Sequence, residues 1–301
     1  MNFKGNNFFM IKKFIQFFLL LFYTCTNICA QEGRTLKFTS AFAMFPDTAR
    51  AKGHFYNGKT YDAGTYYSDS TILVYIPQKF KPQATLQLVF WFHGWGNNID
   101  TACKQFQLLE QFEASGRNAV FVFPEGPKNA PDSYGGKLEQ PAIFRQLVKE
   151  VLEQLVQNKI IKKNSPGVSG NLSITLAGHS GAYRVISKII NKTPVDEVIL
   201  FDAMYGQNEA YFEWLSNPGS RFVNIYTKEG GTFENSQMMM NRIADSLKLP
   251  VLSILEEQLT PSVLQTNNKI FIYSNKGHNE VITNNHNWTL FLKNTPAPKA
   301  Y

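Results

Sequence analysis

Apolar runs typical of strands alternate with segments of helical spacing from about residue 71 onward, and this order restricts the fold more than any other feature. Seven runs rich in β-branched and aromatic residues predict strands at 71–77, 86–92, 118–126, 171–178, 196–203, 221–227 and 269–275. Helices are predicted at 100–116, 141–161, 181–191, 208–217 and 236–248. Because the strands are almost continuously apolar, both faces of their sheet must be covered. We therefore predict an α/β fold with a mostly parallel sheet and helices on both faces.

The first thirty residues are set apart from this pattern. Lys4, Lys12 and Lys13 precede a short apolar run at 14–24, and Ala30 is followed by a polar stretch. This order is typical of a signal peptide cleaved after Ala30, with retention as an uncleaved anchor as the alternative. We expect a secreted or periplasmic protein whose domain spans 31–301, without stable membrane insertion after the signal is removed. The segment 35–70 is expected to add antiparallel strands or rim loops.

Charge and cysteine content limit the partners and the stabilising bonds of the mature chain. Removal of the three leader lysines lowers the formal net charge from +7 to about +4, and no basic block is present, so nucleic acid is not an expected partner. Cys25 and Cys29 lie in the leader, which leaves Cys103 alone in the mature chain. An intramolecular disulfide is therefore excluded, and the hydrophobic core must hold the fold.

Chemistry is expected at the carboxyl ends of the strands, where open parallel sheets bind their ligands. The strand at 171–178 runs directly into Gly-His-Ser-Gly-Ala, residues 178–182. A sharp turn between a strand and a helix exposes a serine hydroxyl, and it requires small residues two positions before and after. Gly178 and Ala182 meet that requirement around Ser180. The amide of Gly181, at the start of the next helix, could bind a developing oxyanion. An ordinary serine at a helix start is the alternative.

A glycine-rich loop at 93–98, His-Gly-Trp-Gly-Asn-Asn, follows the strand at 86–92. Such a loop can direct a backbone N–H into an acyl-transfer site, and the amides of Gly94 and Trp95 are the candidate oxyanion donors. His93 is expected to orient this loop. A simple turn that ends the strand is the alternative.

At these motifs the chain resembles the α/β-hydrolase superfamily. The resemblance rests on HGWG after an early strand, GHSGA in the middle, an acid after a later strand and Gly-His after the last one. It implies an eight-stranded sheet, no cofactor, and a triad in the order serine, acid, histidine. Ala182, where glycine is more common, is the one departure.

The histidine and the acid of the triad are chosen by their positions after strands. His278 follows the last predicted strand and is the expected general base. Asp202 ends the strand at 196–203 among apolar neighbours, where a buried carboxylate would need a partner. Glu229 follows the next strand beside Lys228 and is the alternative acid.

Three further side chains are candidates for lining the substrate cleft. Tyr134 lies in a flexible loop at 124–137, Tyr205 follows Asp202, and His179 precedes the serine. For each of them plain packing is the alternative. No cluster of cysteine, histidine and carboxylate has the spacing of a metal site.

The sequence thus predicts an exported serine hydrolase that cleaves a carboxylic ester through an acyl-enzyme. The substrate would be a small-molecule or polymer-linked ester. A serine peptidase or amidase on the same fold, or a binding protein that has lost its chemistry, are the alternatives.

Overall fold

A computed structural model describes residues 33–165 and 167–296. The predicted signal peptide lies outside the described residues.

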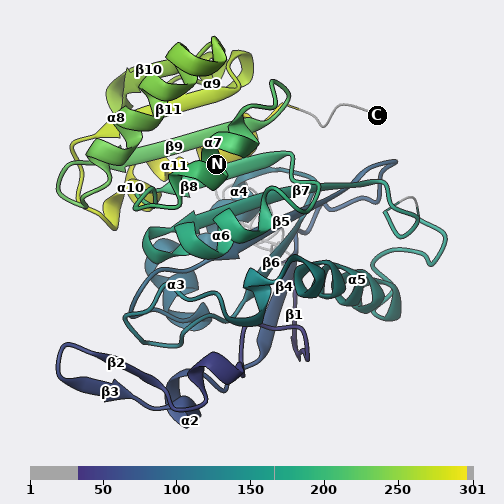
Figure 1. Ribbon diagram of the computed structural model, residues 1–301. Coiled ribbons are helices and arrows are strands. Elements are labelled where there is room, and N and C mark those ends of the chain that lie inside the picture. The colour runs from purple at the N-terminus through teal and green to yellow at the C-terminus, as the bar shows by residue number, and fades with distance from the viewer. Residues whose placement is uncertain (1–32, 166, 297–301) are drawn as a thin grey trace, which may run out of the picture. The chain divides into compact units, whose positions relative to one another are not determined.

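The described chain is built on one large twisted sheet with a strand order of β1-β4-β6-β5-β7-β8-β9-β11-β10 (Figure 1). In chain order its strands are β1 (Arg34–Thr39), β4 (Thr71–Ile76), β5 (Leu86–Phe92), β6 (Val120–Pro124), β7 (Leu172–His179), β8 (Glu197–Phe201), β9 (Arg221–Thr227), β10 (Leu252–Leu255) and β11 (Lys269–Ser274). All neighbouring pairs are parallel except those that β4 makes with β1 and β6. The predicted α/β fold with a mostly parallel sheet is confirmed.

The sheet differs from the expected eight strands because it has nine. The short edge strand β10 was not predicted, since its burial alternates and its partner β11 lies on the other side of a helix. The N-terminal segment supplies the predicted antiparallel strands: β1 pairs with β4, and β2 (His54–Tyr56) forms a separate hairpin with β3 (Lys59–Tyr61).

Helices follow most of the strands. They are α2 (Ala63–Tyr66), α3 (Ile99–Phe106), α4 (Leu108–Ser115), α5 (Pro141–Gln157), α6 (Tyr183–Ile189), α7 (Asn208–Leu215), α8 (Phe233–Arg242), α9 (Pro261–Thr266), α10 (Glu280–Thr283) and α11 (Asn287–Lys293). Short 3-10 turns include η1 (Thr48–Arg50), η2 (Gly136–Glu139), η3 (Ser180–Ala182), η5 (Glu256–Gln258) and η6 (Asn284–His286), and a π-helical turn, η4 (Ile243–Leu247), extends α8. The single helix predicted over 100–116 is divided into α3 and α4 at Gln107, which adopts a left-handed φ of 49°.

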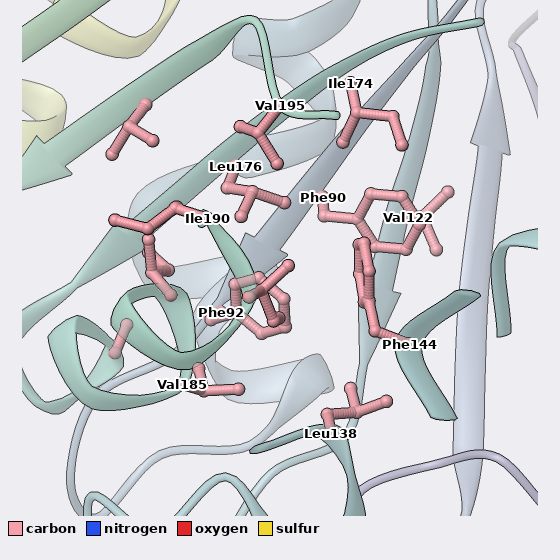
Figure 2. Packing of buried hydrophobic residues seen from close by; sticks show 14 of the residues in the cluster. Phe90, Phe92, Val122, Leu138, Phe144, Ile174, Leu176, Val185, Ile190 and Val195 are labelled. Carbon is pink, nitrogen blue, oxygen red and sulfur yellow. The ribbon is translucent and has the colours of Figure 1, made fainter. Parts of the chain in front are cut away.

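Two hydrophobic cores lie on opposite faces of the sheet. Side chains of α5, α6, α7 and α8 pack on one face, and side chains of α3, α4, α10 and α11 pack on the other. Along β5, Phe90 and Phe92 enter the first core, which Figure 2 shows, whereas Val89 and Trp91 enter the second. This alternation between two buried faces explains why the strand sequences are continuously apolar.

Candidate active site

Ser180 lies at a sharp corner between β7 and the helical turn η3. Its φ of 55° is in the left-handed region, which a non-glycine residue adopts only where the surroundings enforce it. A Cβ on Gly178 would lie 2.5 Å from the Cβ of Ala182, so only glycine fits at 178 while alanine fits at 182. The corner therefore has the geometry of a nucleophile elbow.

The loop at 93–98 lies directly against this corner. A Cβ on Gly94 would lie 2.6 Å from the Cβ of Ser180 and 3.2 Å from its hydroxyl oxygen, so the close approach requires glycine. Trp95 covers Gly181, since a Cβ there would lie 2.7 Å from Cδ1 of the indole ring. Within the described part of the chain, the amides of Trp95 and Gly181 donate no hydrogen bond. Both amides are thus free to receive a ligand oxygen.

His93 is buried at the base of this loop, in agreement with the orienting position expected for it. Its Nδ1–H donates to the carbonyl oxygen of Gly94 over 2.7 Å, and its Nε2 accepts the N–H of Gly126 over 3.1 Å. The carboxyl group of Glu125 lies 3.1 Å from the same Nε2 and accepts the N–H of Ile99, the first residue of α3. Sequence reasoning missed Glu125, although its position after a buried strand is the same signal that identified Asp202.

His278 and Asp202 are in direct contact although 76 residues separate them. The Nδ1 atom of His278 lies 2.6 Å from Oδ2 of Asp202, whose side chain is completely buried. The Asp202 carboxylate also accepts the N–H of Thr227 over 2.9 Å, the hydroxyl of Thr227 over 2.8 Å and the hydroxyl of Thr232. Burial raises the pKa of Asp202, but the hydrogen bonds from His278 and the two threonines outweigh it and hold that pKa below the usual range.

The alternative acid, Glu229, does not contact His278. Its side chain is exposed in the turn after β9. The same turn brings Gly230 so close to Asp202 that a Cβ at 230 would lie 1.7 Å from Oδ2. Of the two carboxylates that the sequence offered, the structure brings Asp202 to the imidazole.

Tyr205 connects the serine with the histidine. Its ring lies 6.2 Å from that of His278, its hydroxyl donates to the carbonyl oxygen of Gly230, and the hydroxyl of Ser180 interacts with it. Among the described residues no hydrogen bond joins Ser180 to His278 directly. In unliganded enzymes the hydrogen bonds between catalytic groups are often long and tighten only when substrate binds.

His179 packs beneath the imidazole of His278. The two rings are 4.4 Å apart, and Nε2 of His179 lies 3.0 Å from the carbonyl oxygen of His278. Burial and the neighbouring His278 lower the pKa of His179 to about 3, so it is neutral and donates this bond. With 4% of its surface exposed it offers little area to a ligand, in contrast to the lining position considered for it.

Tyr134 lies in the loop at 124–137 between two guanidinium groups, 4.6 Å from that of Arg50 and 5.1 Å from that of Arg184. Its hydroxyl donates to Asp47 over 3.0 Å. The ring also lines a small cavity of about 10 Å³ that reaches Gly181, Ser133 and His93. Tyr134 and Tyr205 therefore both border the region around the serine.

In the part of the chain that the structure covers, no group of three or more histidine, cysteine or acidic residues could hold a metal ion. No helix among residues 33–165 and 167–296 is both long and apolar enough to cross a membrane.

Comparison of structures relates this architecture to known proteins. A mutant of the feruloyl esterase module from Clostridium thermocellum, complexed with sinapinate, matches over 91% of this chain and 93% of its own, with a TM-score of 0.51 and 14% identity. A ferulic acid esterase matches over 87% and 98%, with a TM-score of 0.51 and 11% identity. The chain has the α/β-hydrolase fold. No protein-family model matches the sequence, and no curated protein matches it.

Proposed function

We propose that the chain is a serine hydrolase that cleaves a carboxylic ester, with Ser180, His278 and Asp202 as its triad. The observation that carries this proposal is the 2.6 Å contact between a buried carboxylate and the imidazole of His278, beside a serine held at a positive φ. A buried aspartate surrounded by four donors stays ionised, and an ionised aspartate fixes the imidazole tautomer that a general base requires.

In the proposed mechanism, Nε2 of His278 removes the proton from the Ser180 hydroxyl as it attacks the ester carbonyl carbon. This atom is the free nitrogen because Nδ1 carries the proton that is donated to Asp202. The amides of Gly181 and Trp95 then donate to the oxyanion, and Gly94 allows the loop to approach the serine closely. His278 returns its proton to the leaving alcohol. Water, deprotonated by His278, then attacks the acyl-enzyme, and His278 passes that proton to the Ser180 oxygen as the carboxylic acid is released.

A fluorophosphonate probe tests the nucleophile. The purified protein should be labelled at residue 180 and should hydrolyse p-nitrophenyl acetate, whereas Ser180→Ala should be neither labelled nor active. His278→Gln should fold, since the side chain is partly exposed, and should lose both reactions. A folded wild-type protein without labelling or turnover would refute the proposal. Faster turnover of a matched p-nitroanilide would assign a peptidase instead.

We also propose that the protein is exported and cleaved after Ala30. The support is the order of Lys4, Lys12 and Lys13, an apolar run and a small residue. Expression of the full chain should give a protein in the periplasm or the medium whose mass begins at Gln31. A mass that includes the leader would indicate retention instead.

A further inference from the structure

The hairpin of β2 and β3 carries aromatic side chains toward the proposed active site. Its turn, Asn57-Gly58, has φ values of 48° and 75°, which suit a tight two-residue connection. Alternation along β2 places His54 and Tyr56 on one face, with rings stacked at 6.3 Å, and Phe55 on the other. Tyr56 is 36% exposed and Phe55 is 69% exposed. Figure 1 shows the hairpin extending beyond the layers that cover the sheet.

Trp95 continues this aromatic surface up to the serine. Its ring lies 5.3 Å from that of Tyr56 in an edge-to-face arrangement, and it remains 46% exposed. The indole N–H donates to the hydroxyl of Ser133 over 2.7 Å, which fixes the ring. Because the same ring covers Gly181, a surface formed by His54, Tyr56 and Trp95 reaches the residue after the nucleophile. We call these three residues the aromatic platform.

The root of the hairpin is held in place by ionic and close backbone contacts. Arg50, four residues before β2, forms an ion pair of 2.7 Å with the buried Asp132. Gly53 lies so close to β3 that a Cβ there would be 2.2 Å from the carbonyl oxygen of Tyr61. A platform fixed in this way loses little conformational entropy when it binds a ligand.

The platform combines exposed ring faces with polar neighbours. Contiguous exposed aromatic surface beside a reactive group indicates a ligand, because leaving it in water is unfavourable. The loop that carries Trp95 also carries Asn98, whose amide donates to the exposed Asn129 over 2.7 Å. A pyranose ring suits both features, since its C–H groups carry partial positive charge for the aromatic faces and its hydroxyls can bind the exposed amide of Asn129.

The cavity beside Gly181 argues against a long apolar acyl chain. Its volume of about 10 Å³ is close to the space that one water molecule needs and lies far below the usual range of ligand pockets, about 300–1,000 Å³. A long acyl chain therefore has no pocket here, and the larger part of the substrate must lie on the open surface. We propose that the aromatic platform binds a pyranose ring of a carbohydrate ester with a short acyl group, an inference that rests on the ester hydrolysis proposed above.

Selectivity between two acetate esters tests the platform. The wild-type protein should hydrolyse acetylated xylotetraose with a higher kcat/KM than ethyl acetate, which has no ring. Tyr56→Ala should lower the ratio of these two values about tenfold, the effect of losing about one stacking contact. Phe55→Ala, the neighbour on the opposite face of the same hairpin, is the matched control and should leave the ratio at its wild-type value.

Binding without turnover separates this proposal from the proposed function. Ser180→Ala should bind acetylated xylotetraose in a calorimetric titration, and adding Tyr56→Ala but not Phe55→Ala should weaken that binding about tenfold. If the sugar binds in this pattern but the wild type cleaves no ester, the platform stands and the esterase proposal fails. Three results would overturn the carbohydrate proposal while ester cleavage persists. They are the absence of sugar binding, a selectivity ratio that Tyr56→Ala leaves unchanged, and a Tyr56→Ala effect on the hydrolysis of phenyl acetate but not of the sugar ester.

Discussion

Replacing Asp202 with asparagine should remove most of the activity while the fold survives. Two donors face each carboxylate oxygen: the amide of Thr227 and the hydroxyl of Thr232 at Oδ1, and His278 and the hydroxyl of Thr227 at Oδ2. An asparagine NH₂ group must therefore face a donor in either orientation. Facing the backbone amide of Thr227, which cannot turn away, is the less favourable choice. The NH₂ will thus face His278, whose Nδ1 must give up its proton in order to accept.

The consequence is a base in the wrong tautomer. With the proton moved to Nε2, the imidazole cannot accept the hydrogen of Ser180. The loss in kcat should be about 10³–10⁴-fold, or about 4–5.5 kcal/mol of transition-state stabilisation. The loss of ionic hydrogen bonds should also reduce the free energy of unfolding by about 1–3 kcal/mol.

The assay is turnover of p-nitrophenyl acetate, with urea denaturation to confirm that the variant is folded. Glu229→Gln, which changes the exposed carboxylate that the sequence offered as the alternative, is the matched control and should behave as wild type. If Asp202→Asn kept activity within about threefold of wild type and Glu229→Gln lost it, the assignment of the acid would be wrong.

Three further perturbations test the elbow and the buried charges. Gly178→Ala places a Cβ 2.5 Å from that of Ala182, so it should lower the free energy of unfolding by about 1–3 kcal/mol and remove most of the turnover. Ala182→Gly should keep the turnover. Thermal unfolding and the ester assay check both variants. Glu197→Gln leaves Arg117 and Arg221, at 2.9 and 2.8 Å, without their buried counter-charge and should cost about 3–5 kcal/mol in urea denaturation. Asp202 and Glu197 have folded-state pKa values below the usual range. Their ionised forms therefore stabilise the protein at pH values above their unfolded-state pKa values of about 4. The free energy of unfolding, measured by urea denaturation from pH 7 to 3, should therefore depend little on these two groups above about pH 5. It should fall as they become protonated below about pH 4.

The sequence predicted the central strands and the elbow because both depend on local or repetitive constraints. A strand between two cores must be apolar at every position, as at Val89 and Phe90, and this pattern is visible in a single run of residues. The elbow is equally local, since Gly178 and Ala182 lie within two residues of Ser180. Constraints of this kind do not depend on where the rest of the chain lies.

Features that depend on distant contacts were missed or incomplete. The break at Gln107 has no local signal such as glycine; α4 begins there and packs against α11, about 180 residues further along the chain. The Asn57-Gly58 turn between two aromatic runs did carry a hairpin signal, but no local pattern shows that Tyr56 contacts Trp95 or that Arg50 pairs with Asp132. The ninth strand, β10, likewise pairs at an edge of the sheet that no local sequence pattern specifies.

The choice between two acids shows what each level of reasoning contributes. Apolar neighbours placed Asp202 in the interior, and burial alone would make it a poor acid because desolvation raises the pKa of a carboxyl group. The structure supplies the missing stabilisation from the turn after β9, where Thr227 and Thr232 donate and Gly230 makes room. The segment that carries the rival Glu229 therefore acts as the donor shell of Asp202. A carboxylate can stay ionised in that shell, and only an ionised carboxylate can hold the Nδ1 proton of His278 while Nε2 remains free to accept.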